Sequence, residues 1–531
     1  MRALGPAARV LAAPALAALL LVSLAACGGG SSAPKTALDV IAGSELKDVE
    51  PILADAERAT GVHVAMTYAG TIAGIDRLAG GEKHDAAWFA QDKYLALSSA
   101  GKNVRTRTRI MLSPVIVGVK HSVAQQLGWS GGKRVGWRDV QSAVASGRFR
   151  YAMTNPSTSN SGFSAVLSVS TALAGTGDAL RPSQVNQTAI AAFYRGQKIV
   201  SGSSGWLSDA YVNQQDRVDG IITYEASIAA LDASPGLRDK LDRIYPDDGI
   251  VTADYPLDLL DDTKKDAYDR IVAYLKSPDV QKRIAETTYR RPVDTSVATT
   301  SYPPILQETA FPASAASVQQ LLLRFLNQDR VPAHSFYVLD KTGSMDNEDG
   351  TGKSRIQRVR EALYVLAGGD DSLTGQFARF ANREKITILT FSQSVEIDQT
   401  FEMARVNDPA VYDGVRKLAD SLQADGNTAI YTALETALNE AVRDQPADAG
   451  RYASIVLMTD GENNRGDEYD QFERKWRALP DYGRRIHIFP IFIGEASPKE
   501  LKRIADLTGG REFDARSESL AEIFKEIRGY Q

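Results

Sequence analysis

Ser335-Phe-Tyr-Val-Leu-Asp-Lys-Thr-Gly-Ser-Met345 is the most informative stretch in the second half of the chain. Its apolar run ends in the carboxylate Asp340, which is followed by two hydroxyls spaced two residues apart, Thr342 and Ser344. Loops that follow the strands of an open parallel sheet meet at its carboxyl edge, where side chains from separate loops converge. The spacing therefore predicts a strand that ends in a site made of oxygen ligands.

Two later loops offer oxygen donors of the same kind. Thr428 lies in Asp425-Gly-Asn-Thr-Ala-Ile-Tyr431, and Asp460 follows the apolar run Ser454–Thr459. Hard divalent cations such as Mg²⁺ and Ca²⁺ prefer oxygen ligands. The alternative is that Ser, Thr and Asp only cap helices, since they favour helix N-termini. Capping would account for one such loop alone, whereas three ordered loops favour a metal site.

This set of residues resembles the metal-ion-dependent adhesion site of von Willebrand factor type A domains, which has the pattern Asp-x-Ser-x-Ser, then a Thr, then an Asp. The resemblance implies that the ligands are Asp340, Thr342, Ser344, Thr428 and Asp460. Thr342 stands where the pattern has its first Ser. This replacement retains the hydroxyl, so we expect a weaker tuning of the metal affinity and no loss of the site. Mg²⁺ is the expected cation, with Ca²⁺ and Mn²⁺ as alternatives.

Periodicity around these loops favours an α/β domain over residues 331–531. Ile356, Val359, Leu363 and Leu366 recur at helical spacing, and Lys385–Phe391 is an apolar run typical of a buried strand. Strands are also predicted at 452–459 and 486–494, and helices at 428–442, 501–507 and 520–527. Strands that alternate with helices imply a mostly parallel sheet covered on both faces, as in the Rossmann-like fold of the resembling family.

The N-terminus predicts export and a lipid anchor. Arg2 and Arg9 precede an apolar run from Val10 to Ala26 that ends in Leu24-Ala-Ala-Cys27. This layout is typical of a secretory signal peptide, and Leu-Ala-Ala-Cys resembles the lipobox of bacterial lipoproteins. The resemblance implies removal of residues 1–26 and lipidation of Cys27. The alternative of a membrane-spanning helix is disfavoured because the run is shorter than the ~20 uninterrupted apolar residues that a span requires.

Composition limits the remaining possibilities. The 531 residues contain one cysteine, Cys27, so an intramolecular disulfide and a cysteine-based metal site are both excluded. Residues 1–26 hold two arginines and no acids, so their removal changes the formal net charge from −5 to −7. A mildly acidic chain lacks the basic footprint expected of a nucleic-acid-binding protein. Residues 27–36 are small and polar and predict a flexible tether to the outer face of the bacterial cytoplasmic membrane.

Residues 37–295 also alternate strands with helices, and a Pro-rich and Ser-rich linker is predicted at 296–330, with a short helix around 318–326. Three segments carry a resemblance to extracellular solute-binding proteins of bacterial ABC transporters, which have the two-lobed periplasmic-binding-protein fold. They are Ala42-Gly-Ser-Glu45, Asn155-Pro-Ser-Thr-Ser-Asn-Ser-Gly162 and Ile222-Thr-Tyr-Glu-Ala226. The resemblance implies two α/β lobes with a small solute held between them.

Polar turns at helix starts are the candidate solute contacts of this region. Helix N-termini present unpaired backbone amides, and Ser or Thr hydroxyls add donors. The candidates are Ser44, Thr71, Ser113, Ser157, Ser159 and Tyr224. The alternative interpretation is that each of them is a capping or turn residue.

These features favour recognition over catalysis. The five histidines show no zinc-binding spacing, and neither His-Glu-x-x-His nor Gly-x-Ser-x-Gly occurs. We expect a lipid-anchored extracytoplasmic binding protein, not an enzyme, that recognises an acidic side chain of a protein partner through its metal and is coupled to a solute-binding module. One alternative is an ABC-transporter solute receptor with an accessory von Willebrand domain. A second alternative is a cell-envelope hydrolase.

Overall fold

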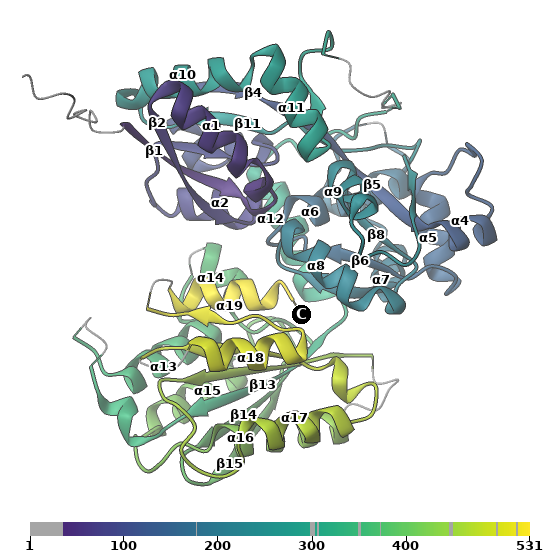
Figure 1. Cartoon of the computed structure of the whole chain (residues 1–531). Helices are drawn as coiled ribbons and strands as arrows, with labels where there is room; N and C mark the ends of the chain where they lie inside the picture. Colours follow the sequence, from purple (N-terminus) through teal and green to yellow (C-terminus); the bar gives the residue numbers. More distant parts are fainter. Residues whose placement is uncertain are drawn as a thin grey trace, which may run out of the picture. The chain divides into compact units, whose positions relative to one another are not determined.

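The computed structural model describes residues 36–176, 178–297, 303–304, 307–348, 352–371, 373–444, 450–494, 498–516 and 519–530. The predicted signal peptide, Cys27 and the predicted tether up to residue 35 therefore lie outside the described residues. Residues from Thr36 onward belong to one unit. Figure 1 shows its helices and strands.

The first sheet has the strand order β2-β1-β3-β11-β4. Its strands β1, β2 and β3 run parallel, and β11 pairs antiparallel with β3 and β4. Four apolar residues of β1 are fully buried, as expected for a strand whose two faces are both covered by helices. The strands are β1 (Thr36–Gly43), β2 (Val62–Ala69), β3 (Ala86–Trp88), β4 (Thr106–Arg109) and β11 (Pro256–Leu259).

A second sheet follows, with the order β10-β5-β8-β6-β7 and with β9 and β12 also paired to β5. The chain passes from the first sheet to the second between β4 and β5 and returns between β10 and β11. Tyr255, at the return, has a φ of 39°, a left-handed conformation that is unusual for a residue other than glycine. The strands are β5 (Met111–Lys120), β6 (Tyr151–Thr154), β7 (Gln197–Ser201), β8 (Gly220–Tyr224), β9 (Leu241–Ile244), β10 (Thr252–Ala253) and β12 (Arg291–Pro292).

Helices cover these two sheets and complete two lobes. The α-helices are α1 (Glu50–Thr60), α2 (Thr71–Ala79), α3 (Lys93–Leu97), α4 (His121–Leu127), α5 (Trp137–Ala145), α6 (Asn160–Ala174), α7 (Gln187–Arg195), α8 (Ser204–Gln214), α9 (Glu225–Ala233), α10 (Lys265–Leu275) and α11 (Pro278–Thr288). Short helical turns are η1 (Ser44–Val49), η2 (Ser99–Asn103), η3 (Pro182–Gln184), η4 (Gln215–Arg217) and η5 (Asp262–Lys264). The two lobes confirm the predicted fold class of the first region.

A helical connection leads to the second region. It consists of α12 (Ala315–Arg324) and η6 (Phe325–Asp329), where the sequence predicted a short helix at 318–326. Val318 and Leu322 are fully buried and belong to the same hydrophobic core as the two lobes. The connection is therefore packed onto the first region along α12.

The third sheet has the order β15-β14-β13-β16-β17-β18. All neighbouring strands are parallel except β14 and β15, which pair antiparallel. The mostly parallel sheet confirms the predicted fold class, and the antiparallel edge strand β15 was not predicted. The strands are β13 (Ala333–Asp340), β14 (Lys385–Phe391), β15 (Val395–Glu402), β16 (Tyr452–Thr459), β17 (His487–Phe492) and β18 (Phe513–Asp514).

Helices cover both faces of the third sheet, and two separate clusters of buried side chains lie against it. Because parallel strands are buried on both faces, their sequences are nearly continuous apolar runs. The helices are α13 (Arg355–Tyr364), α14 (Leu373–Ala378), α15 (Pro409–Ser421), α16 (Ile430–Asp444), α17 (Tyr469–Ala478), α18 (Pro498–Thr508) and α19 (Leu520–Arg528). Shorter turns are η7 (Gly343–Asp346), η8 (Val365–Gly369) and η9 (Gly483–Arg485).

Among the described residues, no helix is both long enough and apolar enough to cross a lipid bilayer.

Gly162 allows α6 to lie close to the end of β6. A methyl group at this position would overlap the backbone carbonyl of Thr154, which cannot move without displacing the strand. We expect Gly162→Ala to lower the free energy of unfolding by about 1–3 kcal/mol, the usual cost of overpacking. Urea unfolding of the two proteins measures this difference. A change smaller than ~0.5 kcal/mol would show that the close approach is not needed.

Candidate metal centre and solute site

The carboxylate of Asp340 lies at the end of β13 and is fully buried. Its Oδ1 accepts a hydrogen bond from the backbone N–H of Thr342 at 2.8 Å, and its Oδ2 accepts one from the Thr459 hydroxyl at 2.6 Å. Burial raises the pKa of Asp340 to about 6, against the effect of these hydrogen bonds. The end of β13 thus places a carboxylate where its charged form is costly without a cation nearby.

The two hydroxyls of the first loop connect Asp340 to the third loop. Thr342 Oγ1 and Ser344 Oγ are 3.1 Å apart, and Ser344 Oγ donates a hydrogen bond to Asp460 Oδ1 at 2.8 Å. Asp460 follows β16, which is the parallel neighbour of β13. Four of the five predicted metal ligands therefore form one connected group at the carboxyl edge of the third sheet.

Thr428 comes from the loop before α16 and is buried. Its backbone N–H donates to the side chain of Asn464 at 2.9 Å, which fixes the loop. A Cβ placed on Gly461 would stand 3.6 Å from Thr428 Oγ1 and 4.0 Å from Ser344 Oγ. Gly461, next to Asp460, thus lies beside both hydroxyls, which places the second loop near the first.

Arg355 belongs to this group and was not predicted. Its Nη1 donates to Asp460 Oδ2 at 2.7 Å, and the side chain is nearly buried at the start of α13. A Cβ on Gly494, after β17, would collide with the guanidinium, so this glycine makes room for it. Arg355 neutralises part of the charge of Asp460 and leaves Oδ1 turned toward Ser344. An Arg inside an amphipathic helix carries no sequence signal for such a role.

The donor set fits a hard divalent cation. It offers two carboxylates and three hydroxyls, all of them oxygen ligands of the kind that Mg²⁺ and Ca²⁺ use. Within the described ranges no three His, Cys, Asp or Glu side chains converge, which leaves these two carboxylates as the acidic part of the site. The Thr342 and Ser344 hydroxyls bond to each other, and Ser344 also bonds to Asp460; such bonds can be exchanged for bonds to a cation.

The predicted solute contacts lie mostly where the two lobes of the first region meet. Ser44, after β1, lies opposite the start of α8, because a Cβ on Gly205 would stand 3.3 Å from Ser44 O. Gly70, before α2, is so close to the carbonyl of Thr158 that no side chain would fit there. The Gln91 side chain donates to Asn160 of the other lobe. The lobes are therefore in direct contact along this line.

The structure separates the six candidates into two groups. Ser44 and Thr71 begin η1 and α2, Ser157 and Ser159 lie in the turn before α6, and all four are buried at this contact. Tyr224 accepts a hydrogen bond from Asn160 at 3.1 Å. Ser157 Oγ donates to Asn155 Oδ1 at 2.6 Å, which stabilises its own turn. Ser113 Oγ accepts from the backbone N–H of Ala226 at 3.1 Å and so holds the start of α9. Ser113 thus has a local structural partner, as the alternative interpretation proposed.

Several polar groups at this contact were missed by the sequence analysis. Buried polar groups are normally hydrogen-bonded, so those without a partner mark places where a ligand or water is expected. Among the described residues, such atoms at the lobe contact are Ser44 Oγ, Glu45 Oε1, Gln91 Oε1, Ser203 Oγ and Tyr255 OH. Only Ser44 was a candidate. Glu45, Gln91 and Tyr255 carried no such signal, whereas Ser203, at the N-cap of α8, is the same kind of polar residue at a helix start and was overlooked.

Glu45 is the charged member of this set. Burial raises its pKa to about 7, although Arg290 opposes the shift. Arg290 itself donates to the backbone carbonyl of Glu45 at 2.9 Å and to Asp48 at 2.6 Å. The carboxyl of Glu45 is therefore held between its acid and ionised forms near neutral pH, with one oxygen available to a solute.

Two protein families match this chain in the order in which the domains occur. Residues 38–290 match the family described as bacterial extracellular solute-binding protein, and residues 336–462 match the von Willebrand factor type A domain. The chain joins an extracellular solute-binding domain to a von Willebrand factor type A (VWA) domain. Domains of these two families are generally not catalytic, and an extracellular solute-binding domain indicates an extracytoplasmic location and a small solute as ligand.

Individual relatives cover only parts of the chain. Calcium-activated chloride channel regulator 1 of Bos taurus is 27% identical over 181 residues, which is 34% of this chain and 17% of that protein. The uncharacterized protein sll0103 of Synechocystis is 27% identical over 158 residues, which is 30% of this chain and 32% of that protein. The chain thus matches less than a third of the length of either relative.

Solved structures similar to this chain include the sulfate-binding protein SubI from Mycobacterium tuberculosis H37Rv. It is 19% identical, with a TM-score of 0.41, and the match covers 54% of this chain and 99% of SubI. A von Willebrand factor type A structure from Catenulispora acidiphila is also 19% identical, with a TM-score of 0.31, and covers 38% of this chain and 43% of that chain.

The raised pKa of Glu45 predicts a pH-dependent effect of substitution in the solute-binding domain. Glu45 has a pKa of about 7 in the folded protein and 4.5 as the unperturbed value, so its burial destabilises the protein increasingly as the pH rises from 4.5 to 7. We expect Glu45→Gln to raise the free energy of unfolding at pH 8 by up to ~3 kcal/mol and to have little effect at pH 4.5.

Urea unfolding at the two pH values measures this difference. Glu286→Gln, on the exposed face of α11, is the matched control and should show no such pH dependence. If the free energies of unfolding of wild type and Glu45→Gln differ by the same amount at both pH values, the assigned pKa is wrong.

Proposed function

We propose that this protein is a lipid-anchored extracytoplasmic binding protein whose VWA domain recognises a protein partner through a divalent cation. The observation that carries the proposal is the convergence of Asp340, Thr342, Ser344, Thr428 and Asp460 from three loops at one edge of the sheet. Mg²⁺ is the cation expected, and Ca²⁺ and Mn²⁺ are compatible with the same oxygen donors.

The charges around the site favour an acidic group on the partner. Two carboxylates would offset the charge of a divalent cation, but Arg355 already pairs with Asp460. The site with its cation therefore keeps an excess of positive charge. When bound, the cation would supply a coordination position for an Asp or Glu side chain of the partner. Asp340 and Asp460 would hold the cation, and the three hydroxyls would orient it without adding negative charge.

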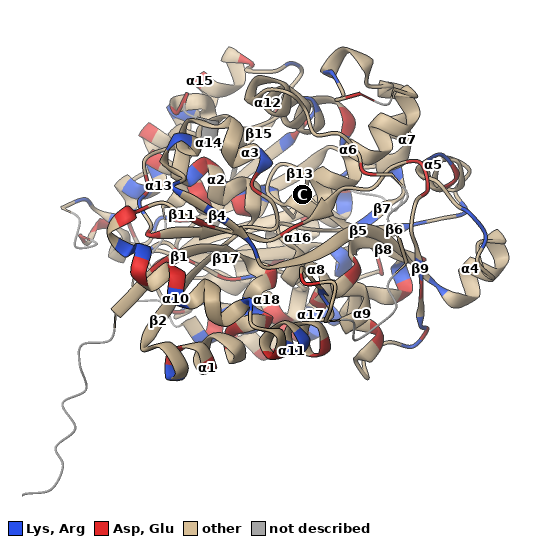
Figure 2. Ribbon diagram, turned by 90° about the horizontal axis from the view of Figure 1, so that it is seen from above, with Lys and Arg blue, Asp and Glu red and all other residues tan. Residues whose placement is uncertain are grey.

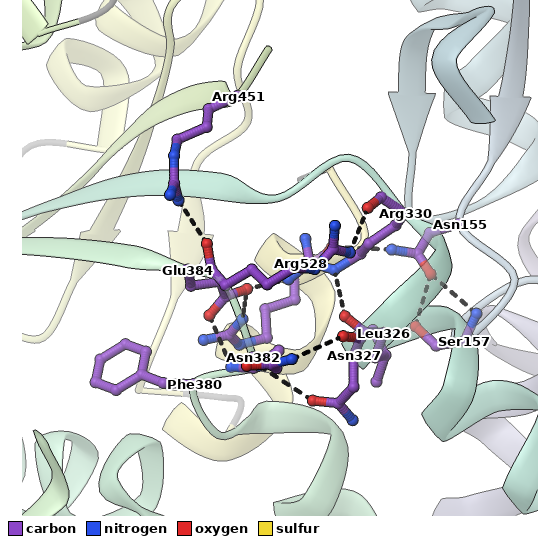
Figure 3. Close-up of polar contacts among 12 residues, drawn as sticks. Asn155, Ser157, Leu326, Asn327, Arg330, Phe380, Asn382, Glu384, Arg451 and Arg528 are labelled. Carbon is purple, nitrogen blue, oxygen red and sulfur yellow. Dashed lines mark hydrogen bonds and ion pairs between the residues drawn. The ribbon is translucent and has the colours of Figure 1, made fainter. Parts of the chain in front are cut away.

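In the same proposal, the solute-binding domain encloses a small polar solute between its lobes and is coupled to the VWA domain through α19. The Lys525 ammonium pairs with Asp76 of α2 at 2.8 Å, and both side chains are buried. Three residues further along, the backbone carbonyl of Arg528 accepts a hydrogen bond from Asn155 Nδ2 at 3.0 Å (Figure 3). α2 belongs to one lobe and Asn155 to the other, so α19 contacts both lobes.

These contacts bear on the solute site because they involve its loops. Asn155 also holds Ser157, and Gly529 lies against Gly202 and Thr158, which face Gly70 of the other lobe. Separation of the lobes would have to break the contact of α19 with at least one of them. The two contacts are thermodynamically linked. A solute that stabilises or destabilises the contact between the lobes through α19 therefore changes the free energy of α19 docking by the same amount.

The alternative of a transporter receptor with an accessory VWA domain shares the solute site but needs no metal-dependent partner. The hydrolase alternative needs a hydroxyl activated as a nucleophile. The hydroxyls that bond to carboxylates in the metal site, Ser344 to Asp460 and Thr459 to Asp340, are accounted for by a cation site instead. The recognition proposal accounts for both sites.

The metal site is tested by cation-dependent stability and partner capture. We expect Mg²⁺ to stabilise the wild-type protein by roughly 2.7 kcal/mol at a concentration one hundred times its Kd. Asp340→Asn/Asp460→Asn should abolish this stabilisation and the Mg²⁺-dependent capture of the partner from detergent-solubilised membranes. Thermal unfolding with Mg²⁺ or chelator gives the first readout, and pull-down gives the second.

Asp346→Asn is the matched control for this experiment. Asp346 is an exposed acid in η7 of the same loop but is not a proposed ligand, so its variant should retain both effects. Partner capture that persists in chelator would exclude metal-dependent recognition.

The coupling through α19 is tested with Asp76→Asn/Lys525→Met, which removes the buried pair without leaving one charge alone. We expect roughly tenfold faster amide hydrogen exchange in the segments 70–76 and 155–161, because the lobes lose a contact that holds them together. Exchange measured by mass spectrometry on folded protein provides the comparison. Lys502→Gln, which breaks the exposed Lys502–Asp506 pair of α18, should leave these segments unchanged. Unchanged exchange in the pair variant would mean that α19 does not hold the lobes.

A further inference from the structure

A basic pocket lies where the solute-binding domain meets the VWA domain, on the side of β7 and α8. Its volume is about 180 Å³, and residues of β7, α8 and η4 face residues of β16, η9 and β17 across it. Five of its lining residues are basic or imidazole side chains, namely Lys198, Arg217, Arg451, Arg485 and His487. No Asp or Glu occurs among the described residues that line it.

This composition is unusual for a protein with a net charge of −5. Figure 2 shows that basic and acidic residues are interspersed along most of the other elements. Near the pocket, Arg484 pairs with Asp481 and Arg150 pairs with Asp219 at 2.8 Å. The pocket therefore differs from its surroundings because no acidic residue lines it.

Three cations of the pocket have no carboxylate partner within the part of the chain that is described. Arg217 donates to the backbone carbonyl of Lys198 at 3.1 Å and to the side chain of Gln214. Neither Lys198 nor Arg485 forms an ion pair with a described acid, whereas Arg451 pairs with Glu402 at 2.8 Å. The uncompensated charge thus belongs to Lys198, Arg217 and Arg485.

The three cations repel one another. Burial lowers the pKa of Lys198, and Arg150, Arg217 and Arg485 lower it further. Burial and Arg485 likewise lower the pKa of Arg217. Burial and Arg217 lower the pKa of His487 to about 4, so this side chain is neutral at pH 7. Like charges held together at a domain junction destabilise it unless an anion offsets them.

The two domains are nevertheless in direct contact beside the pocket. Tyr452 of β16 donates a hydrogen bond from its hydroxyl to the backbone carbonyl of Gln197 in β7 at 2.5 Å. Two guanidinium groups and one ammonium suit a compact oxyanion with several acceptor oxygens, because guanidinium groups can donate two parallel hydrogen bonds.

We propose that this pocket binds a small divalent oxyanion of the phosphate or sulfate class through Lys198, Arg217 and Arg485, and that the anion stabilises the contact between the two domains. The site is distinct from the metal centre and from the solute site between the lobes. It requires neither a divalent cation nor a protein partner, so its test is independent of the proposed function.

The experiment is thermal unfolding of the full mature chain in inorganic phosphate and in chloride at equal ionic strength, without divalent cations. Wild-type protein should show a saturable rise in Tm of at least ~2 °C at millimolar phosphate. Arg217→Gln/Arg485→Gln should lose this response. In chloride the same variant should be at least as stable as wild type, because the repulsion has been removed.

Arg484→Gln is the matched control, since it neighbours Arg485 in η9 but pairs with Asp481 and does not line the pocket. It should retain the full phosphate response. Lys198→Gln, at an exposed position, should weaken the response by itself and gives a second test of the pocket. Isothermal titration of wild-type protein with phosphate gives a direct measure of binding.

Three results would overturn the proposal. They are the absence of a saturable phosphate effect on wild type, an equal effect on Arg217→Gln/Arg485→Gln, and a loss of stability of that variant in chloride. A lipid headgroup is the other source of phosphate chemistry near a membrane. Binding to phosphatidic acid vesicles that depends on Arg217 and Arg485, without a response to inorganic phosphate, would also overturn the assignment of a free anion.

Discussion

Glu384 is a carboxylate in the protein interior, and it remains ionised there only while Arg330 and Arg528 lie beside it. Burial opposes its charge, but the two arginines lower its pKa below the ordinary value. Arg330 follows the helical connection from the solute-binding domain, and Arg528 ends α19. Loss of either arginine would leave a buried charge poorly compensated, which usually costs several kcal/mol. The ion pairs of Glu384 thus fix both the segment at Arg330 where the VWA domain begins and its last helix, α19.

This arrangement explains why α19 is positioned accurately against the two lobes. Arg528 donates its guanidinium N–H groups to Glu384 and to the carbonyl of Ala378, and its own backbone carbonyl faces Asn155. The side chain anchors the helix in the VWA domain while the backbone contacts the loop at the solute site. A displacement of α19 relative to the lobes would therefore be transmitted to the sheet through the same residue.

Local patterns in the sequence were sufficient for much of the fold. The predicted strands at 385–391 and 452–459 coincide with β14 and β16, since buried parallel strands are continuous apolar runs with clear ends. β15 was missed because an edge strand with one solvated face has a mixed polar sequence. The division of the chain at residues 296–330, the metal and the lipid anchor stay predictions.

Contacts between distant residues account for what the sequence could not predict. Asp340, Thr342 and Ser344 follow a fixed spacing, and Thr428 and Asp460 come in order in two later loops. The pairing of Arg355 with Asp460 instead depends on how α13 packs near the end of β17. Glu45 and Gln91 belong to no motif. That each has an oxygen without a hydrogen-bond partner can be seen only in the structure, where the two lobes are in contact. The same holds for Lys198, Arg217 and Arg485, whose charges gather from separate elements.

Asp76 and Lys525 are 449 residues apart, and this separation has a consequence for biosynthesis. A chain that is exported from its N-terminus delivers both lobes long before α19 has emerged. The solute-binding domain can complete its sheets and encounter solute during this interval, while the buried position of Asp76 is still solvated. Docking of α19 would then be the final step of maturation, and it would act on a domain already exposed to the contents of its compartment.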